Sequence, residues 1–219
     1  METYPMRINK YLALKKYSTR RGADELIEKK QVFINGKIAK LGDKINETDK
    51  VEVKGNVKKE YKYFAYYKPI GLMTEEIGKN GLFPIGRLDK NSHGLIILTN
   101  DGRITDQLLN PKYFHEKEYV VKTSNKLRSN FKQKMEAGVN IEGYLTKPCK
   151  VKIIDDHTFR VILTEGKKHQ IRRMCSALFQ EIADLKRVRI MNINLGTLKP
   201  KNSRQIVGKE LETFLKEII

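Results

Sequence analysis

Residues 86–101 read GRLDKNSHGLIILTND, and this stretch decides how the middle of the chain folds. Its second half, GLIILTN at 94–100, is a short apolar run rich in β-branched residues. Such a run is typical of a strand buried in a sheet. The first half is polar and contains one carboxylate, Asp89, in a chain that is strongly basic.

Asp89 is the candidate catalytic group of this stretch. Arg87 precedes it by two residues, so both side chains lie on one side if the segment is extended. Gly86 and Gly94 bracket it and permit close approach of the backbone. A rigid, partly desolvated carboxylate is suited to nucleophilic or electrostatic work at a sugar carbon. The ordinary alternative is a turn aspartate that caps an element.

The segments around this stretch predict a mixture of strands and helices. Further strands are expected at 51–53, 63–67, 118–123, 149–155, 158–166 and 187–196, and helices at 101–110, 167–179 and 208–219. This order predicts an α+β fold with a mixed, mostly antiparallel sheet and flanking helices, not a doubly wound sheet.

The N-terminal segment predicts a small unit of its own. Residues 7–30 read as two short helices, with Ser18 as the cap between them. Asn35 and Gly36 then indicate a tight hairpin turn. Residues 54–62 are polar and charged, which is typical of a linker.

The charge balance points to a polyanionic partner. The 219 residues include 44 Lys and Arg against 26 Asp and Glu, a net charge of +18. Such an excess attracts nucleic acid, because each neutralised phosphate releases counterions. Two domains are expected, residues 1–58 and 59–219, and both carry net positive charge, so both are able to contact one polyanion.

Other classes of protein are disfavoured. No stretch approaches the roughly 18 apolar residues of a membrane span, and we find no basic amphipathic segment or lipid signal. The chain begins without an apolar signal core. Two cysteines and four isolated histidines provide neither a disulfide framework nor metal-ligand spacing. We expect a reduced, cytoplasmic protein without metal or membrane contact.

The two predicted N-terminal helices bring four basic residues near one another: Arg7, Lys10, Arg20 and Arg21. The sequence V-x-I-N-G follows them. Over about residues 7–55 this pattern resembles the S4 RNA-binding domain. The alternative is an ordinary basic helical cap with solvated side chains.

Residues 165–175, EGKKHQIRRMC, form a second basic cluster. Arg172 follows the apolar Ile171, and an arginine directed inward needs a carboxylate partner, for which Asp89 is the candidate. The ordinary alternative is a solvated helix face. The other polar residues of the cluster are candidate RNA contacts: Lys168, Gln170 and Arg173.

Tyr119, in HEKEYVV at 115–121, is the candidate aromatic residue. It is either a core residue of a strand or a platform on which a base stacks, since every base offers a π-face.

In this order, and after an S4-like start, GRLDKNSHGLIILTND, KEY and HQIRRM resemble the ribosomal-RNA pseudouridine synthases of the RsuA/RluB/RluE/RluF group. The elements FPIGRLDK, HEKEY, CKV, QIRRMC and RIMN are most similar to the F type of this group, which acts on the large ribosomal subunit. The resemblance spans nearly the whole chain. It implies isomerisation of uridine to pseudouridine without a metal, nucleotide or redox cofactor.

The resemblance also implies roles for the candidate residues. Asp89 is the catalytic carboxylate, which either attacks C1′ or removes the C2′ proton to give a glycal; the sequence leaves these routes open. Arg172 pairs with Asp89, and Tyr119 stacks on the uracil. Arg87 helps to hold the flipped-out nucleotide by filling the gap in the RNA.

The expected partner is RNA, either large-subunit ribosomal RNA or an assembling subunit, with small-subunit RNA or transfer RNA as alternatives, and the protein is expected to be a monomer. One rival is a non-catalytic RNA-binding or ribosome-assembly protein, which would not need Asp89, Tyr119 and Arg172. Another is an RNA glycosidase or nuclease, for which Glu165 and Asp101 are the available second carboxylates.

Overall fold

The computed structural model describes residues 3–15, 17–55, 60–78 and 80–218. The chain divides into two compact units, Met1–Tyr61 with Asn100–Ile104, and Lys62–Thr99 with Thr105–Ile219. The predicted boundary between residues 58 and 59 lies outside the described residues, as does part of the predicted linker.

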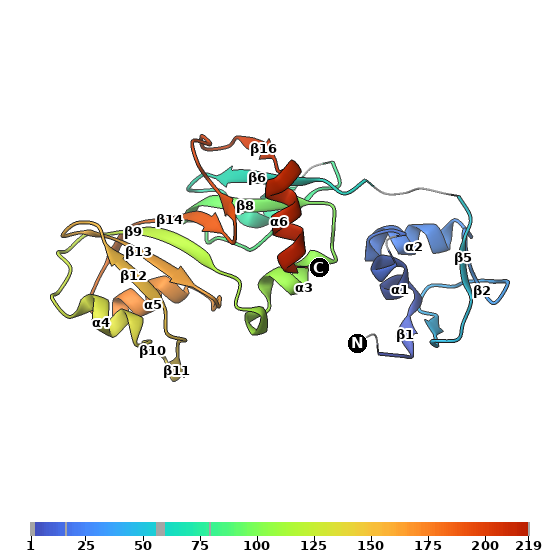
Figure 1. Cartoon of the computed structure of the whole chain (residues 1–219), viewed down its shortest axis with the longest axis horizontal. Coiled ribbons are helices and arrows are strands. Elements are labelled where there is room, and N and C mark those ends of the chain that lie inside the picture. Colours follow the sequence, from blue (N-terminus) through green and yellow to red (C-terminus); the bar gives the residue numbers. More distant parts are fainter. Residues whose placement is uncertain (1–2, 16, 56–59, 79, 219) are drawn as a thin grey trace. The chain divides into compact units, whose positions relative to one another are not determined.

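The described residues of the N-terminal unit form two short helices and five short strands (Figure 1). β2 lies between β3 and β5 in one antiparallel sheet, and β1 pairs with β4. One apolar core, which includes Ile8, Leu12, Ala23 and Val32, joins the helices to the strands. The bounds are β1 Met6–Arg7, α1 Ile8–Leu14, α2 Arg20–Glu28, β2 Val32–Ile34, β3 Lys37–Ile38, β4 Lys44–Ile45 and β5 Val51–Val53.

Local sequence accounts for most of this unit. The two predicted helices are confirmed, but the residue that caps α2 is Thr19 and not Ser18. Thr19 directly precedes the helix with an extended backbone, and its Oγ1 accepts a hydrogen bond from the Gly22 amide at 3.1 Å. Asn35 and Gly36 both have positive φ, 49° and 79°, as a two-residue hairpin turn requires.

The C-terminal unit contains a nine-stranded sheet in the order β12-β13-β9-β14-β8-β6-β16, with β15 beside β14 and β7 beside β8. All pairs are antiparallel except β14 with β8, so the predicted α+β fold is confirmed. The bounds are β6 Tyr63–Lys68, β7 Phe83–Ile85, β8 His93–Thr99, β9 Lys117–Thr123, β12 Lys150–Ile153, β13 Thr158–Leu163, β14 Ile182–Ile190, β15 Ile193–Asn194 and β16 Ser203–Gln205.

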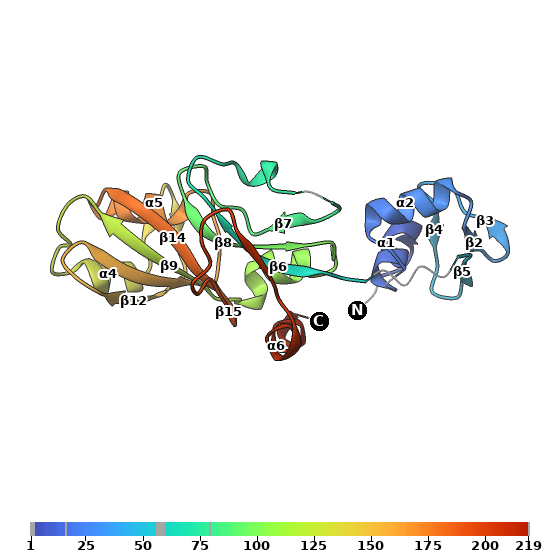
Figure 2. The same ribbon diagram turned by 90° about the horizontal axis from the view of Figure 1, so that it is seen from above.

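Helices and smaller elements flank the sheet: η1 Thr74–Glu76, α3 Ile104–Leu109, η2 Pro111–Tyr113, α4 Phe131–Glu136, β10 Asn140–Ile141, β11 Tyr144–Leu145, α5 Gln170–Ala177 and α6 Gly208–Ile218. α4 and α5 share a core with β9, β12, β13 and β14. α6 lies apart from them, beside the other half of the sheet (Figure 2). The sequence did not predict α4.

α5 begins three residues later than predicted. His169, its N-cap, has a left-handed backbone with φ 53°, so the chain turns there and the helix starts at Gln170. The side chain of His169, at this turn, lies beside Asp89 in the loop that precedes β8.

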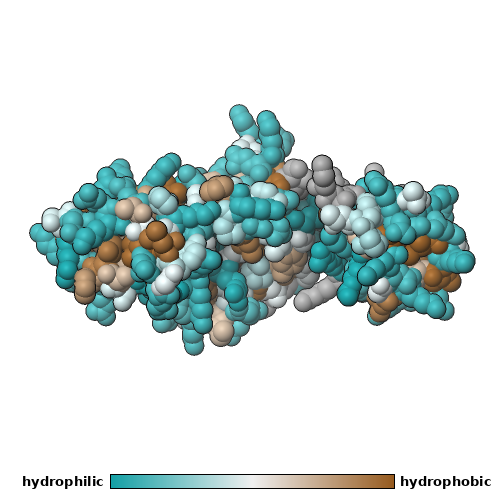
Figure 3. All heavy atoms as spheres, turned by 90° about the horizontal axis from the view of Figure 1, so that it is seen from below, coloured by the Kyte–Doolittle hydropathy of each residue, from teal (hydrophilic) through white to brown (hydrophobic). Residues whose placement is uncertain are grey.

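No helix of the described ranges is long and apolar enough to cross a membrane. The face of the molecule in Figure 3 is mostly hydrophilic, with smaller apolar areas between the polar side chains.

Candidate active site

A cavity of about 550 Å³ lies in the C-terminal unit. Its floor is formed by β9 and β14, and its walls by the loop that precedes β8 and the loop that precedes α5. The volume falls within the range of small-ligand pockets. The lining includes Arg87, Asp89, Lys117, Tyr119, Glu165, Lys168, His169 and Arg187.

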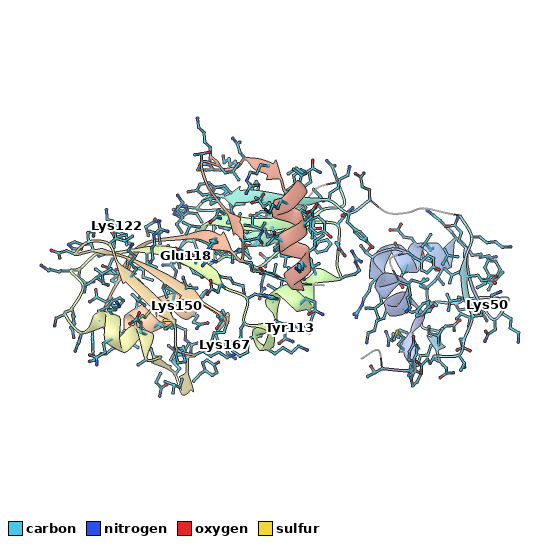
Figure 4. The ribbon with its side chains drawn as sticks, viewed as in Figure 1. Lys50, Tyr113, Glu118, Lys122, Lys150 and Lys167 are labelled. Carbon is cyan, nitrogen blue, oxygen red and sulfur yellow. The ribbon has the colours of Figure 1, made fainter. Side chains whose placement is uncertain are left out.

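The alternation of β9 divides its side chains between two faces. Lys117 and Tyr119 line the cavity. Glu118 lies on the other face, where it accepts hydrogen bonds from Arg160 at 2.9 Å and Arg189 at 2.8 Å (Figure 4). Tyr119 is therefore on the cavity floor, as a base-stacking role requires, and it also packs against two apolar clusters.

Arg187 fixes both ends of the loop that carries Asp89. It is 2% exposed, and it donates from Nη2 to the Gly86 carbonyl at 2.6 Å and from Nε to the Leu95 carbonyl at 2.7 Å. Gly94 has φ 109°, and a Cβ there would collide with the Arg187 carbonyl oxygen. The predicted close backbone approach at Gly94 is thus confirmed, and only glycine fits.

Two further side chains hold the same loop. The fully buried Lys68 ammonium donates to the carbonyls of Pro69, Lys90 and Ser92 at 2.7–3.3 Å. Burial lowers the pKa of Lys68, and the negative charge of Asp89 opposes that shift. Thr74 Oγ1 also donates to the Leu88 carbonyl at 2.8 Å and accepts from the Leu88 amide at 3.1 Å. The loop is therefore rigid on both sides of Asp89.

The Asp89 side chain is about one-third exposed, and its carboxylate lies 3.4 Å from His169 Nε2. The pairing predicted between Arg172 and Asp89 is wrong in this structure. Arg172 Nη2 instead donates to the Asn91 carbonyl at 2.9 Å and to Ser92 Oγ at 3.1 Å. His169, at the left-handed turn before α5, is instead the side chain that lies beside the Asp89 carboxylate.

Arg87 and Lys168 are exposed side chains that line the cavity. Arg87 Nη1 lies 3.6 Å from a carboxylate oxygen of Glu75. Its side chain is 83% exposed, so this ion pair does not prevent it from reaching a bound polymer.

One predicted RNA contact, Gln170, is corrected, whereas Arg173 has protein partners but stays partly exposed. Gln170 is buried; its Nε2 donates to Glu165 at 2.7 Å, and its Oε1 accepts from the Lys167 amide at 2.9 Å. Arg173 donates to the Ile141 carbonyl and to the Glu142 carboxylate at 2.9 and 2.7 Å. Both side chains therefore hold the protein together, because helix α5 turns them toward its own neighbours.

Neither alternative carboxylate is placed as a second catalytic acid. Glu165 lines the cavity, but it is buried and accepts hydrogen bonds from the Tyr144 hydroxyl, the Lys147 amide and Gln170 at 2.6–2.9 Å. Asp101 is fully buried and accepts from the Arg103 guanidinium at 2.6 and 2.7 Å. These contacts favour structural roles for both. The described residues contain no group of three side chains arranged to hold a metal ion.

The four basic residues predicted to contact RNA lie on or next to the two helices of the N-terminal unit. Arg7 and Arg20 are exposed and Lys10 is half-buried, whereas the side chain of Arg21 is outside the described part of the structure. Asn9 on α1 donates to Asp24 on α2 at 2.9 Å, which links the helices and holds this basic surface together.

Sequence reasoning missed Lys68, Lys117, His169 and Arg187 as contributors to the site. Lys117 is the first residue of KEY. The one signal available in the sequence was that Lys117 and Tyr119 are two residues apart at the start of a predicted strand, so their side chains lie on the same face. Arg187 gives no local signal, because it lies among other charged residues of its strand, and its partners are about a hundred residues away.

Comparisons with known proteins show what the chain is similar to. Residues 59–177 match the family model described as RNA pseudouridylate synthase, and residues 6–51 match the S4 domain model. The chain is 38% identical to the dual-specificity RNA pseudouridine synthase RluF of Escherichia coli (strain K12), covering 97% of this chain and 79% of that protein. It is 32% identical to the ribosomal large subunit pseudouridine synthase B of Bacillus subtilis (strain 168), covering 94% of each.

A solved structure described as a pseudouridylate synthase superimposes on 98% of this chain and all of its own, with a TM-score of 0.71 and 26% identity.

Proposed function

The chain belongs to the RNA pseudouridine synthase family, and we propose that the uridine it isomerises lies in large-subunit ribosomal RNA. The relative from Bacillus subtilis is named for the large ribosomal subunit, and it matches over nearly the full length of both chains. The name of the Escherichia coli relative includes dual specificity, which supports testing a second RNA beside large-subunit ribosomal RNA.

The observation that carries the chemistry is one cavity with a rigidly held carboxylate on its wall and an aromatic ring on its floor. A stacked uridine exposes neither C1′ nor C5 to such a cavity, so the nucleotide must flip out of its helix. Asp89 then acts on the sugar while Tyr119 stacks on the uracil. Exposed Arg87 fills the space that the base leaves in the RNA.

The reaction breaks the N1–C1′ bond, turns the uracil in the cavity and joins C5 to C1′. Asp89 either bonds to C1′ or takes the C2′ proton. Arg172 contributes as a positioning residue, since it holds Asn91 and Ser92 in the turn that follows Asp89. Enclosure of the base also keeps water away from the cleaved intermediate.

Pseudouridine mapping tests the proposal. Unmodified large-subunit, small-subunit and transfer RNA are each incubated with the protein, and pseudouridine is located by carbodiimide labelling and primer extension. A new stop in large-subunit RNA is the expected result. A stop confined to another RNA would change the substrate, and no stop in any of them despite tight binding would contradict the proposal.

A second prediction concerns the N-terminal unit. Replacing Arg20 and Arg21 together with glutamine is expected to weaken RNA binding and to flatten the dependence of log Kd on log salt by about one to two units, because two phosphate contacts are lost. Binding is measured by filter retention over a range of salt concentrations.

The matched control removes two exposed charges from the hairpin side of the same unit, Lys37→Gln with Lys40→Gln. If both double variants lose the same affinity, the effect comes from general charge, and the helix surface has no special role.

A further inference from the structure

We propose that Lys117 is a catalytic residue that contacts the uracil and stabilises the negative charge the base acquires when the glycosidic bond breaks. This inference rests on the proposed function. In this inference Lys117 stabilises the charge on the departing base, whereas Asp89 reacts with the sugar.

The position of Lys117 is the first support. It is 8% exposed, it lines the cavity, and it shares a face of β9 with Tyr119. Alternate residues of a strand are about 7 Å apart. A pyrimidine stacked on the Tyr119 ring therefore brings the edge of the base within reach of the Lys117 ammonium.

The contacts of Lys117 are the second support. Its Nζ donates to the His115 carbonyl at 3.3 Å, and among the described residues no carboxylate lies within ion-pair distance of it. The neighbouring carboxylate on the strand, Glu118, faces the other side of the sheet and is occupied by Arg160 and Arg189. A buried ammonium without a counter-ion destabilises the fold, so a lysine at this position points to a functional reason.

Arg187, the other buried cation on the cavity floor, has protein partners that explain its position. Arg187 donates to two loop carbonyls, and these contacts account for its burial. Burial and the charge of Arg187 lower the pKa of Lys117 to about 8, so most molecules keep the ammonium charged at neutral pH. The Lys117 ammonium is therefore already positioned to donate hydrogen bonds to an anion that forms in the cavity.

By either route the reaction places a negative charge on the base, which such a cation would stabilise. If Asp89 bonds to C1′, the carboxylate becomes a neutral ester and the electron pair of the N1–C1′ bond leaves with uracil. If Asp89 takes the C2′ proton, the C–H pair forms the C1′=C2′ double bond and uracil again leaves with the N1–C1′ pair. In both routes one negative charge passes from Asp89 to the base, where N1, O2 and O4 share it.

Rejoining reverses this transfer. C5 of the anion bonds to C1′ as Asp89 departs or returns its proton to C2′. The C5 proton then passes to water and N1 takes up a proton from water, which restores the uracil ring with no net change in charge. Lys117 needs only to donate a hydrogen bond to a base oxygen throughout, so no net proton transfer from it is involved.

The test compares Lys117→Met with wild type on two RNAs that differ only in the target base, uridine or 5-fluorouridine. Fluorine makes the departing base more acidic, so its anion needs less stabilisation. Cleavage of the target N-glycoside is followed in single-turnover reactions by nuclease digestion and chromatography. We expect the substitution to slow the uridine reaction about 100-fold and the fluorinated one less than about 10-fold.

The RNA Kd should change by less than about twofold, because the base is neutral before cleavage. Methionine preserves the length of the side chain and has no hydrogen to donate. Lys117→Leu, which likewise lacks a donor, is carried alongside and should reproduce the pattern. Lys122→Met is the matched control: it removes the same charge from the exposed end of β9, where Figure 4 labels it, and should leave both rates unchanged.

Equal slowing with both RNAs, or no slowing, would overturn the role of Lys117. A Kd increase that accounts for the whole effect would also overturn it. A wild type that leaves the uridine RNA unchanged would instead overturn the proposed function itself, so the two failures are distinguishable.

Discussion

Replacing Asp89 with alanine is expected to lower the single-turnover rate of pseudouridine formation by at least about 10⁴-fold, because the group that acts on the sugar is lost. Glu165 cannot substitute, since three donors within the protein already occupy its oxygens. The isosteric Asp89→Asn should lose a comparable amount, because an amide is a far weaker nucleophile and base.

The same substitution should leave the protein folded and able to bind. The Asp89 carboxylate is about one-third exposed, and its ion pair with His169 is long at 3.4 Å. The free energy of unfolding should therefore change by less than about 1 kcal/mol. RNA Kd, measured at one salt concentration, should stay within about twofold of wild type.

Asp156→Ala is the matched control, because it removes an exposed carboxylate that pairs with Lys126 at the surface of the same unit. It should retain full activity. An Asp89→Ala protein that reacts within about tenfold of the wild-type rate would show that another group performs the cleavage.

The second large effect is expected at Arg187. Arg187→Met leaves the Gly86 and Leu95 carbonyls without their buried donor, and it removes the contacts that hold the catalytic loop. We expect a loss of about 3 kcal/mol in the free energy of unfolding, which lowers the Tm by roughly 6–12 °C. Thermal unfolding followed by circular dichroism measures the change in Tm.

Activity of this variant should fall about 100-fold even at temperatures where it is fully folded, because Asp89 is no longer held in place. Arg160→Met provides the comparison: Arg160 is a half-exposed arginine that pairs with Glu118 on the other face of the sheet, and its loss should change stability by less than about 1 kcal/mol. Equal stability losses in the two variants would contradict the special role of Arg187.

Features that depend on neighbours in the sequence were predictable. The two N-terminal helices, the hairpin at Asn35 and Gly36, and the apolar strand at 94–100 follow from periodicity and turn chemistry, which act within a few residues. The α4 helix was missed because it is short and is stabilised mainly by burying Phe131 and Met135 in a core shared with distant strands.

Patterns in the sequence were thus sufficient for the α+β fold class, the family, and the choice of Asp89 and Tyr119 as candidates. The side chains that surround Asp89 could be identified only from the folded chain. Asp89 lies beside His169, which has a left-handed backbone, and not beside the expected partner Arg172. Strand pairing placed Lys117 and Arg187 on one cavity floor. Such contacts join residues up to a hundred positions apart, and their geometry depends on backbone turns and sheet register, which no local pattern in the sequence encodes.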